Sequence, residues 1–309
     1  MIPPDAPKRN LGPPGGLRLL LWVRRALPDF LFDPLLSAGI WLVMPWLPER
    51  RRHIRALRAA AGAPVHLRAV FQTLRAFMDV LVLRLRVAGG EPPCCGLEGP
   101  YAADFERVVT SPRPALFGTF HFGHSDLLGF LLTQRGLHVT MVRLRMENSD
   151  DVALFERQFA GAVAFIWVNE PDEMLFALKQ ALQVGRCVAM QCDRHAYTAK
   201  TEGFRFLGAR RRFPFTIYHL AILFQRPVMF CFGLPASGGG TSVRPMPVFQ
   251  PDPDASREEN HARGRVHFQT VLTELEAAVR RHPSLWFNFE PLNPVVPDRE
   301  AAASVAAVR

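Results

Sequence analysis

The residues most able to do chemistry stand together at positions 121–126, in the order His-Phe-Gly-His-Ser-Asp. This segment follows a short apolar run, 115–120, and precedes an amphipathic stretch, 127–134. In open α/β sheets, ligands bind at the loops that follow the carboxyl ends of the strands. The segment is therefore the first candidate for a functional site.

The spacing of His121 and Asp126 favours an acid–base pair. A turn at Gly123 would bring the carboxylate of Asp126 back to one nitrogen of the His121 ring. The carboxylate would fix the ring tautomer and stabilise the imidazolium, so that the other nitrogen takes a proton from an alcohol or amine. With a thioester as acyl donor, no protein nucleophile is required, because a thiolate leaves readily.

Three other interpretations of the segment stay open. The sequence Gly-His-Ser-Asp-Leu imitates the nucleophile elbow of hydrolases, with Ser125 as nucleophile, although leucine stands where that motif has its last glycine. His121, His124 and Asp126 are metal-ligand types, but no other His or Cys cluster nearby has ligand spacing, so we predict no metal. Ser125 or Asp126 is also suited to cap the following helix.

Several blocks in this chain resemble the lysophospholipid acyltransferase superfamily, which includes the bacterial lipid A late acyltransferases. The His-x4-Asp spacing resembles the first motif of that family, and Trp-Phe-Asn-Phe at 286–289 resembles the closing motif of a bacterial branch of predicted acyltransferases. The resemblance covers roughly residues 17 to 290. The blocks between the two motifs are Val-Ala-Met-Gln-Cys-Asp-Arg at 188–194, Phe-Leu-Gly at 206–208, Phe-Pro at 213–214, Leu-Ala at 220–221 and Pro-Val at 227–228.

The resemblance implies a role for particular residues. His121 would be the general base that activates the acceptor hydroxyl, and Asp126 would be its partner. Asp193 would line the same cleft, and Arg194 would bind phosphate or stabilise the oxyanion. Phe206 and Gly208 would shape the loop on the acceptor side.

Lipid A acyltransferases also carry an essential arginine between the His and Asp blocks. Arg143, Arg145 and Arg157 are the candidates in this chain, and we select Arg143. The residues that we expect to contact substrate are Gly123, Arg143, Asp193, Arg194, Phe206 and Gly208.

The elements that must position these residues alternate along the chain. Short apolar runs predict strands, and the amphipathic segments between them predict helices. Such alternation implies an α/β fold with a mostly parallel sheet that helices cover on both faces. The predicted strands are 115–120, 139–142, 164–168, 187–190 and 228–234, and the predicted helices are 127–134, 151–159, 173–184, 215–224 and 257–281.

The N-terminal region has the composition of a segment that lies on a membrane. Its longest uncharged stretch, 34–48, has fifteen residues, too few for a helix to cross a hydrocarbon layer about 30 Å thick. Trp22, Trp41 and Trp46 lie among aliphatic residues and are followed by four arginines, which favours the interface plane. A buried helix hairpin is the alternative. A further amphipathic helix, 67–85, is expected to pack on the domain that follows.

The charge is distributed unevenly. Residues 1–90 hold 14 Lys and Arg against 5 Asp and Glu, whereas residues 91–309 hold 23 of each. A basic, apolar N-terminal region followed by a neutral remainder indicates binding to lipid headgroups rather than to nucleic acid. The five cysteines form no CxxC pair, so neither a disulfide framework nor a zinc ribbon is indicated and a reducing compartment is expected. No secretory signal is apparent.

The resemblance implies a bacterial acyltransferase, and together with the basic, apolar N-terminal region we expect it on the cytoplasmic face of the inner membrane, bound peripherally or monotopically. Its expected partners are an acyl carrier protein or acyl-CoA donor, a lipid or glycolipid acceptor and the membrane surface, with no nucleic acid and no cofactor. The expected divisions are a disordered start at 1–16, interfacial helices at 17–90, an α/β domain at 91–290 and a flexible tail at 291–309.

Overall fold

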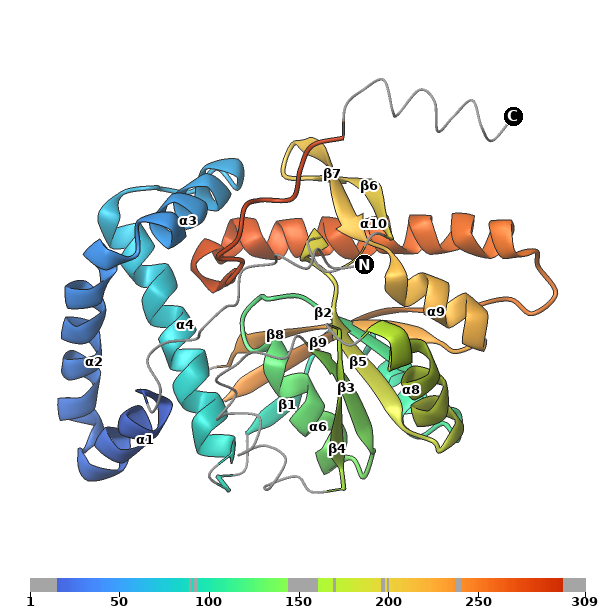
Figure 1. Cartoon of the computed structure of the whole chain (residues 1–309), viewed down its shortest axis with the longest axis horizontal. Helices are drawn as coiled ribbons and strands as arrows, with labels where there is room; N and C mark the ends of the chain where they lie inside the picture. Colours follow the sequence, from blue (N-terminus) through green and yellow to red (C-terminus); the bar gives the residue numbers. More distant parts are fainter. Residues whose placement is uncertain are drawn as a thin grey trace.

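The computed structural model centres on a seven-stranded sheet with the order β1-β9-β8-β2-β5-β3-β4 (Figure 1). It describes residues 16–88, 90–91, 94–143, 161–168, 171–195, 198, 200–236 and 240–296. Only the β8–β9 pair is antiparallel among the neighbouring strands of this sheet. The prediction of a mostly parallel α/β sheet is confirmed. The strands are β1 (Cys95–Leu97), β2 (Leu116–Thr119), β3 (Val139–Arg143), β4 (Val163–Trp167), β5 (Cys187–Gln191), β8 (Val228–Pro235) and β9 (Thr241–Phe249).

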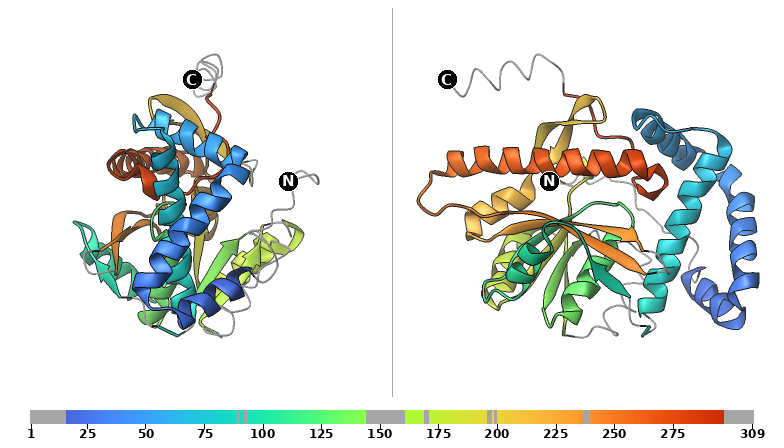
Figure 2. Two further views of the ribbon diagram at one scale, coloured as in Figure 1. Left: turned by 90° about the vertical axis from the view of Figure 1, so that its left-hand side faces the viewer. Right: turned by 180° about the vertical axis from the view of Figure 1, so that it is seen from behind.

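Helices pack on both faces of the sheet, which explains why its strands are nearly continuous apolar runs. On one face, Leu116 and Val188 belong to a large core cluster together with residues of α8, α9 and α10. On the other face, Phe117 and Ala189 belong to a smaller cluster with residues of α5 and α6. Figures 1 and 2 show these helices on either side of the strands. The helices are α5 (Ala102–Val109), α6 (Leu128–Gln134), α8 (Pro171–Gln183), α9 (Thr216–Phe224) and α10 (Arg257–Arg281).

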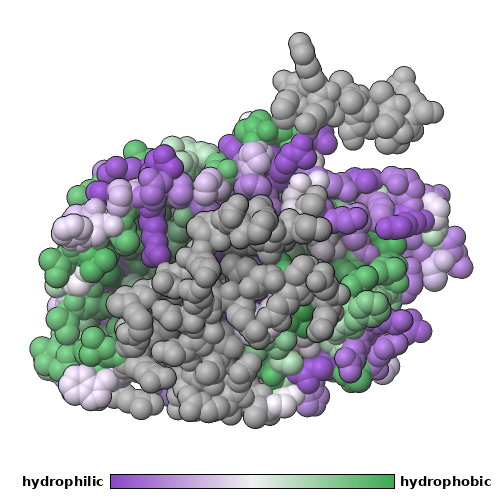
Figure 3. Space-filling model, in the orientation of Figure 1, coloured by the Kyte–Doolittle hydropathy of each residue, from purple (hydrophilic) through white to green (hydrophobic). Residues whose placement is uncertain are grey.

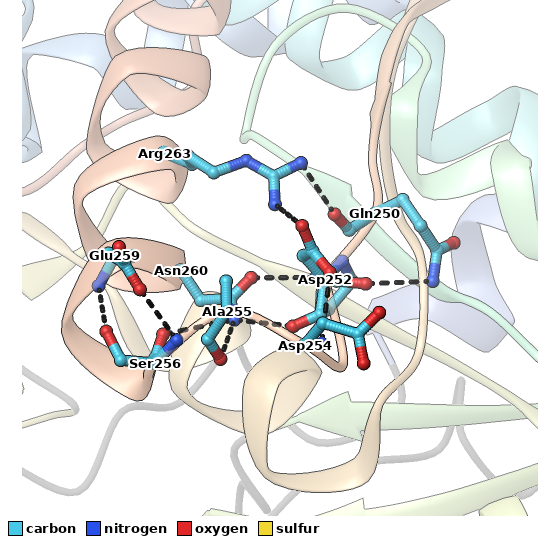
Figure 4. A network of polar contacts seen from close by, with 9 residues as sticks. Gln250, Asp252, Asp254, Ala255, Ser256, Glu259, Asn260 and Arg263 are labelled. Carbon is cyan, nitrogen blue, oxygen red and sulfur yellow. Dashed lines mark hydrogen bonds and ion pairs between the residues drawn. The ribbon is translucent and has the colours of Figure 1, made fainter.

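The long helix α10 begins at a well-formed cap (Figure 4). Ser256 and Glu259 form a capping box, in which each side chain accepts a hydrogen bond from the backbone N–H of the other residue. One turn further along, Asn260 accepts from the N–H of Asp252 and donates to its carbonyl, both at 2.8 Å. These contacts fix the residue at which α10 begins. After the other end of α10, the chain forms the short helix η4 (Pro283–Leu285) at the edge of the sheet.

A two-stranded hairpin, absent from the predicted strands, stands beside α10. It pairs β6 (Thr201–Phe206) with β7 (Ala209–Pro214). Leu207 and Gly208 form its turn with φ values of 49° and 75°, the left-handed conformation that two-residue hairpin turns require. The N–H of Leu207 donates to Glu276 of α10 at 2.6 Å, which ties the turn to the helix.

In the part of the chain that the structure describes, four α-helices precede the sheet: α1 (Gly16–Ala26), α2 (Asp29–Val43), α3 (Pro48–Ala60) and α4 (Leu67–Ala88), with the short helix η1 (Met44–Trp46) after α2. The predicted helix at 67–85 is confirmed as α4. Buried side chains hold α2, α3 and α4 together, among them Ile40, Ile54 and Val70. Arg58 of α3 is only 3% exposed and donates to Thr73 of α4 and to Ser284 of η4, so it joins this layer to the body.

The outer side of α1, α2 and η1 exposes large apolar side chains. Trp22 is 67% exposed, Phe30 and Leu42 are each 74% exposed, and Trp46 is 81% exposed. Figure 3 shows hydrophobic side chains gathered on this side of the molecule, at its left. Within the described ranges, no single helix is long and apolar enough to cross a bilayer; α2 with η1 and α3 passes that test only as a pair bent by 99°. Membrane association stays a prediction.

Some predictions fall outside the described residues: the helix at 151–159, nearly all of the start at 1–16 and the tail from 297 onward. The described beginning of the tail, 291–296, lies against β7. There, the N–H of Arg212 donates to the carbonyl of Pro294 at 3.0 Å, and the N–H of Val296 donates to the carbonyl of Arg210 at 2.8 Å.

Candidate active site

The loop after β2 is held by close contact between two backbones. Gly123 has a φ of +55°, and a Cβ atom there would lie 2.1 Å from the carbonyl oxygen of Gly233 in β8. The N–H of His124 donates to that same oxygen at 2.8 Å. Only glycine allows this approach. Gly123, expected to contact substrate, therefore has an evident backbone role in placing the loop.

His121 is paired with Asp193 at the carboxyl edge of the sheet. The Nδ1 atom of His121 lies 2.7 Å from Oδ1 of Asp193, and the backbone N–H of His121 donates to Oδ2 at 3.0 Å. Thr119 and Gln191 are register partners at the ends of the neighbouring parallel strands β2 and β5. Each member of the pair comes two residues after its strand ends, so the sheet topology brings them together.

The segment after α10 completes the surroundings of Asp193. Trp286 donates its indole N–H to Oδ2 of Asp193 at 3.3 Å, and Asn293 donates to the backbone carbonyl of Asp193 at 2.9 Å. Two backbone hydrogen bonds also join this segment to the loop that carries His121. The N–H of Gly123 donates to the carbonyl of Leu285, and the N–H of Phe287 donates to the carbonyl of His121, both at 2.7 Å.

The electrostatics of the pair favour an ionised Asp193. Burial acts to raise the pKa of this fully buried carboxyl group, but the charge and hydrogen bonds of His121, with the charge of Arg194, lower the pKa below its usual value. A carboxylate only accepts hydrogen bonds, so Nδ1 of His121 donates to Asp193, and in the neutral ring the lone pair is then on Nε2. The His121 side chain is 19% exposed. The arrangement provides an oriented base at the edge of the sheet.

Asp126, the predicted partner of His121, has its backbone in the short helix η2 (Ser125–Leu127). Its side chain lies outside the described part of the chain, so a pairing between Asp126 and His121 stays a prediction. Sequence reasoning placed Asp193 in the same cleft but did not identify it as the carboxylate on Nδ1. The signal available was its position directly after a predicted strand.

The other polar residues of the loop hold the backbone. His124 is 8% exposed, its Nδ1 lies 2.8 Å from Oγ1 of Thr241, and burial lowers its pKa to about 4. Ser125 is 4% exposed; it donates to the carbonyl of Phe122 at 2.6 Å and accepts from the N–H of Gly233 at 3.3 Å. These contacts do not favour Ser125 as a nucleophile. Among the described side chains, no group of three or more His, Cys, Asp or Glu residues is placed to hold a metal ion.

Arg194, Phe206 and Gly208 differ in how directly they are connected to the His121–Asp193 pair. Arg194 follows Asp193, and its buried Nε atom lies 3.3 Å from a carboxylate oxygen of Glu290 without the alignment of a hydrogen bond. Phe206 packs edge-on against Trp286 with ring centroids 5.3 Å apart, so it supports the indole that contacts Asp193. Gly208 lies in the exposed turn of the hairpin, and its positive φ explains why a glycine stands at this position.

Arg143 ends β3, and its guanidinium lies 5.9 Å from the centroid of the Phe165 ring. It also lines a hollow beside the carboxyl ends of β2, β3 and β5. The two other candidate arginines, Arg145 and Arg157, lie outside the described residues.

No family model matches the chain, and no curated protein matches it.

Proposed function

We propose that this protein is an acyltransferase that moves an acyl chain from a thioester to a hydroxyl group of a lipid or glycolipid. The thioester is that of an acyl carrier protein or of CoA. One observation carries the proposal: the buried carboxylate of Asp193 accepts from Nδ1 of His121, which leaves Nε2 as a base beside the carboxyl ends of the strands. The motif resemblance supplies the substrate class.

The reaction follows from an oriented base. Nε2 of His121 takes the proton of the acceptor hydroxyl while its oxygen attacks the carbonyl carbon of the thioester. Asp193 stabilises the imidazolium that forms. The tetrahedral intermediate collapses, the carbon–sulfur bond breaks, and the thiolate leaves with the proton held on His121. The products are the acyl ester and the free thiol, and the base is restored.

Stabilising the oxyanion of the intermediate requires a hydrogen-bond donor or a cation near the carbonyl. Arg194 and Arg143 are the two described arginines of the predicted set. Arg194 follows Asp193 directly and is only 21% exposed. We assign stabilisation of the oxyanion to Arg194 and substrate binding to Arg143.

The proposed site of action is the surface of the bacterial inner membrane, on its cytoplasmic face. The exposed side chains of α1, α2 and η1 form an apolar surface with tryptophans, and α3 adds exposed arginines such as Arg52 and Arg55. Tryptophan and arginine next to apolar residues are typical of segments that lie in the headgroup layer. Such a position would bring a lipid acceptor to the enzyme.

A sedimentation experiment tests the membrane proposal. Vesicles of phosphatidylglycerol and phosphatidylethanolamine should pellet the wild-type protein at low salt. Replacing Trp22 and Trp46 by serine should lower the bound fraction severalfold, whereas replacing the exposed Phe176 of α8 (75% exposed) should not. Equal pelleting of all three proteins would contradict the proposed surface.

The catalytic proposal is tested by mass spectrometry of total lipids. Cells that lack the protein should lack one acylated lipid, and expression of the wild type should restore it. His121→Ala should fail to restore it, and Ser125→Ala should restore it wherever that variant folds. Restoration by His121→Ala would contradict the proposed mechanism and would instead favour a lipid-binding role without catalysis.

A further inference from the structure

The segment 284–289, which follows α10, contacts both members of the His121–Asp193 pair. The indole N–H of Trp286 donates to Asp193 at 3.3 Å. The N–H of Phe287 donates to the carbonyl of His121 at 2.7 Å. The geometry of the pair therefore depends on where this segment lies. Figures 1 and 2 show the end of α10 and the chain after it beside α3 and α4, so these two helices are placed to hold the segment.

Arg58 of α3 joins this segment to two other parts of the chain. Its Nε donates to the carbonyl of Pro64 at 2.7 Å. Its Nη1 donates to two hydroxyl groups, Oγ1 of Thr73 at 3.2 Å and Oγ of Ser284 at 3.3 Å. These three partners belong to the loop after α3, to α4 and to η4. A guanidinium group presents its donors in a rigid fork, so this one side chain fixes three parts of the chain relative to one another.

The burial of Arg58 shows that its hydrogen bonds are what the position requires. The residue is 3% exposed, and within the described residues its contacts are with neutral acceptors and not with a carboxylate. A buried charge without an opposite charge is costly, and its hydrogen bonds offset only part of that cost. An apolar side chain of similar length would fill the same space without the cost. Packing alone therefore does not explain an arginine here.

A second contact joins α3 to the far end of the segment. Nδ1 of His53 lies 2.9 Å from the carbonyl oxygen of Phe289; because a carbonyl only accepts, the ring N–H donates. Between the two contacts, Phe77 of α4 packs edge-on against the rings of Phe287 and Phe289, with centroid distances of 5.6 and 5.0 Å. The segment is therefore held by α3 at both ends and by α4 in the middle.

Ser284 is the residue through which Arg58 can act on the site. It comes directly before Leu285, whose carbonyl accepts from the N–H of Gly123 at 2.7 Å, and two residues before Trp286. A displacement of η4 would therefore reach both the loop after β2 and the indole beside the carboxylate of the pair. A displacement of about 1 Å that begins far from the chemistry can cost about 100-fold in rate.

We infer that Arg58 is a positioning residue of the proposed active site: by holding Ser284, it fixes the segment that contacts His121 and Asp193. The inference rests on the proposed function. Arg58 acts through the segment and not on the substrate. The helices α3 and α4 are then part of the working site, in addition to any contact that the neighbouring helices make with a membrane.

The first experiment measures the positioning without substrate, by amide hydrogen exchange of the full-length protein. The N–H groups of Gly123 and Phe287 donate across the contact between the segment and the loop after β2. Ser284→Ala should speed the exchange of both amides at least about fivefold, because it loosens the segment. Thr73→Val is the matched control. It removes the other hydroxyl partner of the same Nη1 atom, so it should lower the unfolding temperature and leave both amides as in the wild type.

The second experiment separates positioning from stability by steady-state kinetics. Thiol release is followed with acyl-CoA donors from butanoyl to hexadecanoyl, with a bacterial lipid extract as acceptor. Ser284→Ala and Arg58→Met should each lower kcat about threefold to tenfold, with KM within about twofold of the wild type. Both should move the acid limb of kcat against pH to higher pH, because a displaced indole no longer donates to Asp193. Ser284→Thr, which keeps the hydroxyl, should restore kcat, and Thr73→Val should leave kcat and the limb unchanged.

Two results would overturn the inference while the proposed function stands. One is turnover by the wild type with equal losses of kcat in Ser284→Ala and Thr73→Val. The other is exchange of the two amides in Ser284→Ala at the wild-type rate. Where Arg58→Met does not fold, Ser284→Ala decides. No turnover by the wild type with any donor would instead count against the proposed function, and the exchange result alone would then decide whether Arg58 positions the segment.

Discussion

Oδ1 of Asp193 lies 2.7 Å from Nδ1 of His121 although the two residues are 72 positions apart in the chain. Both side chains come from loops that follow neighbouring parallel strands. Asp193 is fully buried, so water does not compete for its hydrogen bonds. The relationship supplies an oriented imidazole, on which each catalytic prediction below depends.

Replacing Trp286 by phenylalanine should lower kcat about threefold to tenfold with little change in KM. The substitution removes the indole N–H that donates to the Asp193 carboxylate and keeps an aromatic ring in the same place. A hydrogen bond to a charged group contributes about 1.5–3 kcal/mol, and we expect the low end or less because this bond is long, at 3.3 Å. A carboxylate that has lost a donor holds the imidazolium proton more tightly. The acid limb of kcat against pH should therefore move to higher pH.

The matched control for this variant is Phe206→Leu, which loosens the packing on Trp286 but leaves the indole N–H in place. We expect it to lower the unfolding temperature without moving the acid limb. If both variants move the limb equally, Trp286 acts by packing alone.

Replacing Gly123 by alanine should abolish activity and destabilise the protein by about 2 kcal/mol or more. The added Cβ would lie 2.1 Å from a backbone oxygen of β8, and a backbone atom cannot move aside cheaply. Gly136→Ala is the control, because that glycine also has a positive φ, +76°, but no atom of the described residues lies within 4 Å of its added Cβ. Urea unfolding should show a cost of about 1–2 kcal/mol for the control, from the conformation alone. Equal costs at both positions would mean that contact with β8 is unimportant.

Stability should fall as the pH drops from about 6.5 to about 4, in part because of His124. Burial lowers its pKa in the folded protein to about 4, so in this window the unfolded chain binds a proton that the folded protein cannot bind. The stabilisation is complete above pH 6.5 and is lost as the pH falls to about 4; for a shift of this size it amounts to on the order of 3 kcal/mol.

Urea unfolding of the wild type and of His124→Gln, at pH 7.5 and pH 4.5, measures this contribution. Two partly buried histidines titrate in the same direction, because burial also lowers the pKa values of His219 and His267. The difference between the two proteins isolates His124, and the wild type should lose more stability. Parallel losses would show that His124 does not titrate as its burial requires.

The fold could be predicted from the sequence wherever a local pattern decides the structure. The apolar run at 187–190 became β5, and the stretch 257–281 became α10 with the same bounds, because capping residues and periodicity mark such elements directly. The hairpin of β6 and β7 was not predicted. Its strand at 209–214 carries three consecutive arginines, and its turn depends on contact between Leu207 and Glu276 of α10.

The candidate site could be predicted only in part. His121 was selected because it follows a predicted strand in a polar cluster, and Asp193 was selected from the resemblance. Their pairing depends on β2 lying next to β5 in the sheet, and that order does not follow from the order of strands along the chain. Trp286 was noted only as part of a resemblance, because its contact with Asp193 requires the return of the chain after α10.

The measurement that tests the central claim most directly compares two substitutions that remove a single negative charge, Asp193→Asn and Asp126→Asn, in the acyl-transfer assay. We predict that Asp193→Asn lowers kcat at least about 100-fold, as an asparagine that favours the wrong tautomer does in other His–Asp pairs. KM should change little, and Asp126→Asn should have a clearly smaller effect. Wild-type kcat in Asp193→Asn, with activity lost only in Asp126→Asn, would contradict the assignment of Asp193 as the carboxylate that orients His121.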